Sequence, residues 1–140
     1  MLDAYEVPMV QYRAIKAGAD YVTPEGEVVP NSRLTTEPTP PKKFAYMSDT
    51  AYTEKHLDLI HGVDCLYHES TFLKEDIARI KATLHSSAEQ AAMLAKKAEV
   101  KQLIIGHYSA RYTDSKVFLD EARAVFENTF AARDGAIYLF

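Results

Sequence analysis

Acidic or imidazole side chains follow three short apolar runs of this sequence, and such side chains can hold metal ions or move protons. Asp49 follows the run 44–47, the run 63–67 leads into His68 and Glu69, and His107 follows the run 102–106. A carboxylate can bridge two divalent ions, and neutral imidazole suits zinc. A free imidazole can also protonate a leaving oxygen. The pattern therefore favours a hydrolytic centre.

Each candidate also has a structural explanation. Asp49 could cap a following helix, and His68 could be a buried histidine with satisfied hydrogen bonds. His85 could be a helix-entry residue, His107 could bond backbone beyond its strand, and Arg111 could pair with a nearby carboxylate such as that of Asp114. The carboxyl ends of parallel strands meet at one edge of a sheet. Separate structural explanations do not account for so many acidic and imidazole groups at that same edge.

The spacing of these residues alone does not establish a metal site. Zinc takes about four partners per ion, and the chain contains no His-x-His pair. Two metals held side by side would activate water for an in-line displacement at phosphorus.

The elements that must position these residues alternate between strands and helices. The expected strands are the buried run 44–47, then 63–67, 102–106 and, after a turn at Asp134-Gly135, 136–140. The expected helices are 53–60, a short one near 77–80, one that starts at the overlapping capping boxes of Ser86 and Ser87, and 115–128. Gly62 is the expected stop of the first helix. This alternation predicts an α/β fold.

Residues 1–42 differ from the rest, because they hold all six prolines. We expect extended pieces at 21–23 and 28–29 around a turn at 24–26, and a connector at 35–41, where consecutive prolines exclude a helix. The expected organisation is one domain or part of one: an irregular lead-in over 1–42 and a regular β/α core over 43–140.

Composition sets limits on partners and compartment. The chain has 140 residues, 47% hydrophobic and 26% charged, with a net charge of -4, which argues mildly against a broad cationic face for nucleic acid. The one cysteine, Cys65, excludes an internal disulfide and fits a reducing cytoplasm. Neither a signal peptide nor a membrane span is expected.

Four segments together resemble ribonuclease Z, a family of the metallo-β-lactamase superfamily. They are Tyr46-Met47-Ser48-Asp49-Thr50, Leu66-Tyr67-His68-Glu69-Ser70-Thr71-Phe72, Leu84-His85-Ser86-Ser87-Ala88-Glu89-Gln90-Ala91-Ala92 and Leu103-Ile104-Ile105-Gly106-His107-Tyr108-Ser109-Ala110-Arg111-Tyr112. Their order and spacing match the family. Ser70 and Ser87 stand where alanine and threonine are usual. The implied fold is the C-terminal half of a metallo-β-lactamase-type αββα sandwich.

The resemblance implies roles for seven residues. Asp49 would bridge two metal ions, usually zinc, and His107 would bind one of them. His85 would be the general acid, oriented by Glu69. Substrate would be contacted by the remaining three, Ser109, Arg111 and His68.

The implied activity is zinc-dependent removal of the 3′ trailer of precursor tRNA by metal-activated water, leaving a 3′ hydroxyl. The family's His-x-His-x-Asp-His cluster is expected before residue 1, so this chain alone is expected to be inactive and to bind zinc poorly. A homodimer is expected, because a half-domain exposes a sheet face. Two alternatives remain: another superfamily phosphodiesterase or sulfatase, and a non-catalytic α/β binding module.

Overall fold

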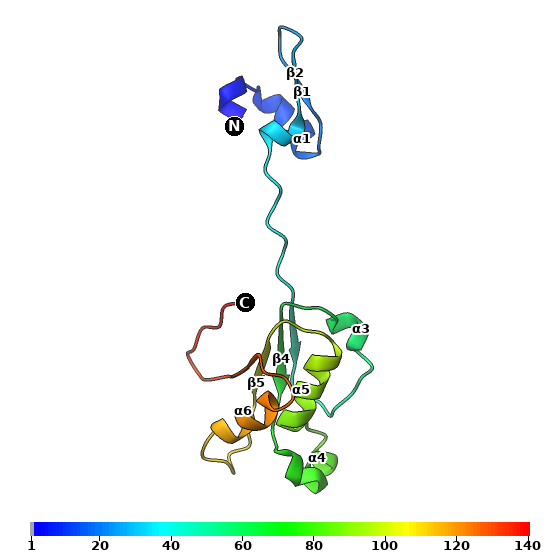
Figure 1. Ribbon diagram of the computed structural model, residues 1–140, viewed down its shortest axis with the longest axis vertical. Coiled ribbons are helices and arrows are strands. Elements are labelled where there is room, and N and C mark those ends of the chain that lie inside the picture. Colours follow the sequence, from blue (N-terminus) through cyan, green and yellow to red (C-terminus); the bar gives the residue numbers. More distant parts are fainter. Residues whose placement is uncertain (1) are drawn as a thin grey trace. The chain divides into compact units, whose positions relative to one another are not determined.

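The computed structural model describes residues 2–140 and divides them into two compact units, one ending at Pro40 and one spanning Pro41–Phe140 (Figure 1). Each unit has its own buried apolar cluster. The expectation that the whole chain is part of a single domain stays a prediction.

The first unit pairs two short strands, β1 (Tyr21–Val22) and β2 (Val28–Val29), in antiparallel register. The sequence predicted this pair, and the connector at 35–41 forms no helix or strand. It did not predict the short helices of this unit, which are the 3-10 turns η1 (Leu2–Tyr5) and η2 (Met9–Gln11) and the α-helices α1 (Tyr12–Lys16) and α2 (Asn31–Leu34).

The second unit is built on a parallel sheet in the order β3-β4-β5-β6. Its strands are β3 (Phe44–Met47), β4 (Cys65–Glu69), β5 (Leu103–Gly106) and β6 (Thr129–Ala131). The helices between them are α3 (Leu57–Ile60), the 3-10 turn η3 (Lys74–Asp76) with α4 (Ile77–Thr83), α5 (Ala88–Lys97) and α6 (Lys116–Arg123). Because all four strands run in the same direction, their carboxyl ends share one edge.

One face of this sheet is covered by α5 and α6 (Figure 1). Leu66, Leu103 and Ile105 project from the strands into a core that also holds Leu94 of α5 and Phe118 of α6, and all five are fully buried. The alanines of α5 bring that helix close to the sheet. Ser87 caps α5 with the predicted capping box: its side chain accepts from the Gln90 N–H, and the Gln90 side chain accepts from the Ser87 N–H.

The prediction that 44–47 is a buried strand was wrong in its burial. The strand forms, but β3 is an edge strand, and Phe44 and Tyr46 are 52% and 65% exposed. The helix expected from residue 53 begins only at Leu57, because the Thr53 hydroxyl accepts from the Lys55 N–H and closes a turn instead. Gly62 ends it as predicted, with a φ of 64°.

The C-terminal region was predicted less well. The helix expected over 115–128 ends at Arg123, and β6 forms over Thr129–Ala131, where no strand was expected. Within the described chain, the expected strand 136–140 does not form. After the turn at Gly135, Ile137 and Leu139 are almost fully exposed, whereas the Tyr138 hydroxyl donates to the carbonyl of Ala131. None of the described helices is both long and apolar enough to cross a bilayer.

Candidate metal centre

The carboxyl ends of β3, β4 and β5 bring the predicted polar residues to one edge of the sheet. Asp49 follows β3, Glu69 is the last residue of β4, and His107 follows β5. Asp49 and His107 have positive φ angles of 49° and 61°. Few non-glycine residues take this conformation, and it recurs at functional sites. The chain therefore turns sharply at both positions.

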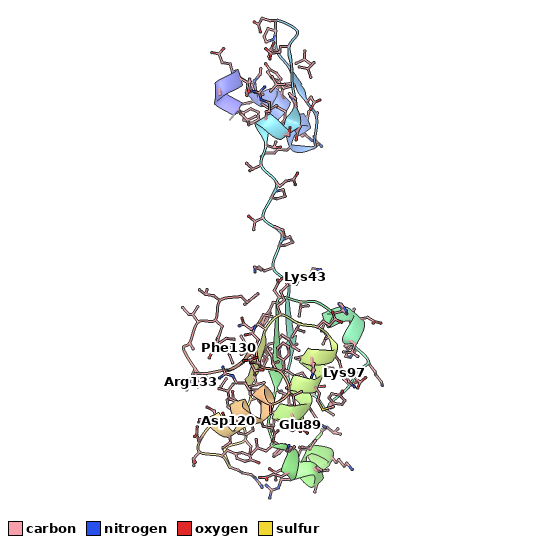
Figure 2. The ribbon with its side chains drawn as sticks, viewed as in Figure 1. Lys43, Glu89, Lys97, Asp120, Phe130 and Arg133 are labelled. Atoms are coloured by element: carbon pink, nitrogen blue, oxygen red, sulfur yellow. The ribbon has the colours of Figure 1, made fainter. Side chains whose placement is uncertain are left out.

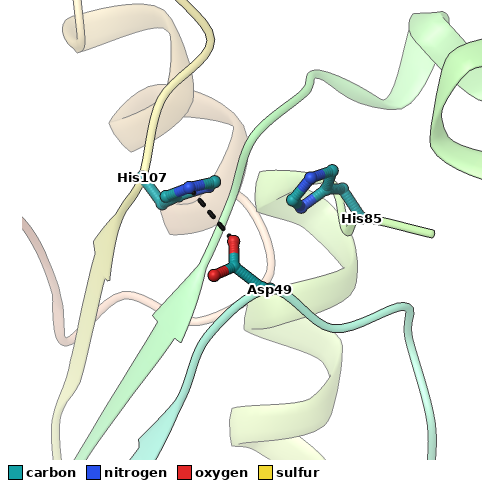
Figure 3. A group of neighbouring side chains, drawn as sticks. All are labelled: Asp49, His85 and His107. Atoms are coloured by element: carbon teal, nitrogen blue, oxygen red, sulfur yellow. Dashed lines mark ion pairs between the residues drawn. The ribbon is translucent and has the colours of Figure 1, made fainter. Parts of the chain in front are cut away.

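Asp49, His85 and His107 lie together (Figure 3). Each offers one ligand atom, and these atoms all lie within 4.8 Å of one another. The Nε2 atom of His107 lies 3.1 Å from Oδ1 of Asp49, and the His85 and His107 rings stack with centroids 5.3 Å apart. The structure thus gathers the three residues that the sequence analysis placed at the centre of the site.

Glu69 forms hydrogen bonds to the segments that carry this cluster. Its side chain is fully buried, and Oε1 accepts hydrogen bonds from the backbone N–H groups of Thr50 (3.1 Å) and Ser86 (3.0 Å) and from Nδ1 of His85 (2.8 Å). Oε2 accepts from the N–H and the hydroxyl of Thr71. One carboxylate therefore joins the segments that follow β3 and β4 to the segment that enters α5. It also leaves Nε2 as the free nitrogen of His85.

Thr71 contacts Glu69 and both histidines of the cluster, and no role was predicted for it from the sequence. Its Oγ1 lies 2.7 Å from Oε2 of Glu69, 2.9 Å from Nδ1 of His107 and 3.2 Å from Nδ1 of His85. Its carbonyl accepts from the N–H of Ser109. Nothing in its residue type or spacing distinguished it from other threonines.

His68, predicted to contact substrate, is not brought to the cluster. Its side chain is fully buried, and Nδ1 donates to the carbonyl of Glu69 at 2.6 Å. No other described residue offers a partner to Nε2. Burial lowers the pKa of His68, so the ring is neutral near neutral pH. Substrate contact by His68 stays a prediction that this position does not favour.

Ser109 and Arg111 lie on the loop that follows His107. Tyr108 and Tyr112 pack against Phe118, each with ring centroids 4.8 Å apart, and so anchor this loop to α6. The backbone N–H of Arg111 donates to the Ser109 hydroxyl, and among the described residues the Arg111 side chain forms no ion pair. Its charge therefore remains available to a ligand.

A cavity of about 520 Å³ adjoins His107 on the β6 side. Its lining is formed by Gly106, His107, Tyr108, Ser115, Ala132, Arg133 and Asp134. Arg133, labelled in Figure 2, is exposed and contributes a cation to this lining.

The donor set of the cluster fits a divalent metal ion. One carboxylate and two imidazoles supply the oxygen and nitrogen ligands that zinc accepts, and zinc takes about four ligands. The three described side chains thus supply three of the about four ligands that one zinc ion takes. Sequence reasoning had treated His85 as a general acid, whereas the geometry also allows it to be a ligand.

Comparisons with known proteins identify the superfamily of the chain. A family model described as "Beta-lactamase superfamily domain" matches residues 19–108. The chain is 51% identical to a ribonuclease Z of Bacteroides fragilis over 134 residues and 53% identical to one of Parabacteroides distasonis over 135 residues. Each alignment covers 96% of this chain and 44% of the relative, so the chain spans less than half of their length.

Two solved structures share the fold. The metallo-β-lactamase fold protein YhfI from Bacillus subtilis matches 68% of this chain and 39% of its own, with a TM-score of 0.62 and 21% identity. The short form of human tRNase Z matches 76% and 34%, with a TM-score of 0.54 and 23% identity. The expected fold class and the resemblance to ribonuclease Z are confirmed, and the chain belongs to the beta-lactamase superfamily.

Proposed function

We propose that this chain is part of a zinc-dependent endoribonuclease that removes the 3′ trailer of precursor tRNA and leaves a 3′ hydroxyl. One observation carries the proposal: the alignment with ribonuclease Z, 51% identical, extends over 134 of the 140 residues and so includes the positions of Asp49, Glu69, His85 and His107. The 4.8 Å cluster of three of them supports the same activity.

Each residue of the cluster has a chemical task in this proposal. Asp49 and His107 would hold the metal, with the Asp49 carboxylate shared if two ions are bound. Zinc, when bound, would activate water and stabilise charge on the phosphoryl group. His85 delivers a proton from Nε2 to the leaving oxygen, while Glu69 holds its Nδ1–H at 2.8 Å and so fixes the direction of the ring.

The substrate's phosphates would lie above this edge of the sheet. Arg111 is exposed there and Ser109 is partly exposed, and both can donate hydrogen bonds to phosphate oxygens. The cavity beside His107 offers space for part of the RNA next to the cleaved bond.

The proposed cellular setting is the cytoplasm, where tRNA maturation occurs and where the lone buried thiol of Cys65 stays reduced. We also propose a homodimer. Phe44, Tyr46 and Phe130 share the sheet face opposite α5, and each is more than a third exposed. Such apolar patches mark interaction sites. Sedimentation equilibrium should show dimers for the native chain and monomers for Tyr46→Glu, and a native monomer at high concentration would contradict this proposal.

A chimeric enzyme tests the activity. This chain would replace the matching 134 residues of the Bacteroides fragilis ribonuclease Z. We expect the chimera to cut precursor tRNA and to leave a 3′ hydroxyl. His85→Ala should lower the cleavage rate about 10²–10⁴-fold, the contribution of a positioned proton donor.

The control is His61→Ala, because His61 is an exposed histidine remote in sequence from the cluster, and this variant should leave the rate unchanged. A folded chimera that hydrolyses small phosphodiesters but not precursor tRNA would favour another superfamily hydrolase. A folded, zinc-loaded chimera without any hydrolysis would favour a binding module.

A further inference from the structure

The hydrogen bonds beneath the cluster determine where the protons lie. Glu69 accepts backbone N–H groups at both carboxylate oxygens, from Thr50 and Ser86 at Oε1 and from Thr71 at Oε2. Backbone N–H groups can only donate, so both oxygens act as acceptors. The Nδ1 atom of His85, 2.8 Å from Oε1, must therefore carry a hydrogen.

The Thr71 hydroxyl has a single hydrogen, and its shortest contact identifies the acceptor. Oγ1 lies 2.7 Å from Oε2 of Glu69, so the hydroxyl donates there. Only lone pairs remain on Oγ1 to face Nδ1 of His107, which lies 2.9 Å away. That contact is a hydrogen bond only if Nδ1 of His107 carries a hydrogen.

We propose that Thr71 is a positioning residue. Its hydroxyl donates to Glu69 and accepts from His107, which fixes the Nδ1–H tautomer of His107 and leaves Nε2 as the metal-binding atom. This inference rests on the proposed metal centre. It gives Thr71 the task of a group that orients a metal-binding histidine through its other ring nitrogen. Nε2 of His107 is the atom that lies 3.1 Å from Asp49 Oδ1.

A competing arrangement would place the hydrogen on Nε2, donating to Asp49. Burial decides between them. Thr71 is 7% exposed, whereas the side chains of Asp49 and His107 are 68% and 44% exposed. Water can replace the hydrogen bond at the exposed carboxylate, but it cannot easily reach the buried hydroxyl. The Nδ1–H tautomer therefore prevails when the ring is neutral.

Nitrogen-15 NMR of the metal-free 140-residue chain tests this. Spectra of the five histidine rings would be recorded well above the ordinary histidine pKa of about 6.5, so that the rings are neutral. His85→Gln and His107→Gln assign the two rings. We expect both to show a hydrogen on Nδ1 and a bare Nε2. A neutral His107 with its hydrogen on Nε2 would overturn the inference without any variant of Thr71.

Two variants separate positioning from simple packing. Thr71→Val keeps the shape but removes the hydroxyl, and we expect His107 to change to the Nε2–H form while His85, still held by Glu69, keeps its Nδ1–H form. Thr71→Ser should restore the native pattern. An unchanged His107 tautomer in Thr71→Val would overturn the inference. Because neither metal nor RNA is present, these outcomes are independent of whether the nuclease proposal holds.

Discussion

Removal of the Glu69 carboxylate should destabilise the fold before any chemistry is considered. The side chain is fully buried and accepts three backbone N–H groups, those of Thr50, Thr71 and Ser86. Each buried donor left without an acceptor costs about 1–3 kcal/mol. Glu69→Ala should therefore lower the free energy of unfolding by at least about 3 kcal/mol, a large part of the total of about 5–15 kcal/mol typical of such proteins.

Glu69→Gln refines this prediction. Its amide oxygen can still accept from Thr50 and Ser86, but its amide nitrogen then faces the N–H of Thr71. One unsatisfied donor predicts a loss of about 1–3 kcal/mol. The exposed Glu127 makes no side-chain hydrogen bond within the described chain, so Glu127→Ala is the matched control and should change stability by less than about 0.5 kcal/mol.

Urea unfolding followed by circular dichroism measures these differences. The midpoints should fall in the order control, Gln, Ala, with unchanged m-values. If Glu69→Ala lost less than about 1 kcal/mol, water would be satisfying these N–H groups, and the view of Glu69 as the organiser of the cluster would be refuted.

Three further predictions concern single residues. Burial lowers the pKa of His68, so below about pH 6.5 the unfolded chain gains a proton that the native chain does not. The free energy of unfolding should therefore be highest above that pH and fall below it by up to about 1.4 kcal/mol per pH unit. Urea midpoints against pH should show a slope that flattens in His68→Asn, and an unchanged slope would contradict this. Ser87→Ala removes the capping box of α5 and should cost about 0.5–2 kcal/mol in the same assay, so a neutral effect would count against the cap. A Cβ on Gly106 would lie 2.5 Å from the Tyr67 hydroxyl, so Gly106→Ala should displace the Tyr67 ring and cost about 1–3 kcal/mol; a calorimetric Tm equal to the native value would show that the ring moves freely.

The strands β3, β4 and β5 and the capped helix α5 were predictable because their residues act locally, although β4 begins and ends two residues later than expected. The runs that became β3, β4 and β5 are apolar and bounded by turn residues, and the capping box of Ser87 and Gln90 is a pattern over four positions. The meeting of Asp49 and His107 followed from parallel order, since both come after strands that end at one edge, whereas His85 comes from the segment that enters α5.

The misses have physical causes of a different kind. β6 forms through pairing with β5, a contact between segments distant in sequence, and no element was expected over its three residues. The exposure of β3 depends on its place at the edge of the sheet, which its own residues do not encode. The role of Thr71 depends on three hydrogen-bond distances, and no sequence pattern specifies those.

A calorimetric zinc titration tests the central claim, that Asp49 and His107 form the metal-binding edge of this chain. Two proposed ligands, or three with His85, fall short of the four that zinc prefers. We therefore expect the native chain to bind zinc more weakly than micromolar, and Asp49→Asn and His107→Gln to abolish that binding. Binding that neither variant changes would contradict this claim, and sub-micromolar stoichiometric binding would contradict the expected shortage of ligands.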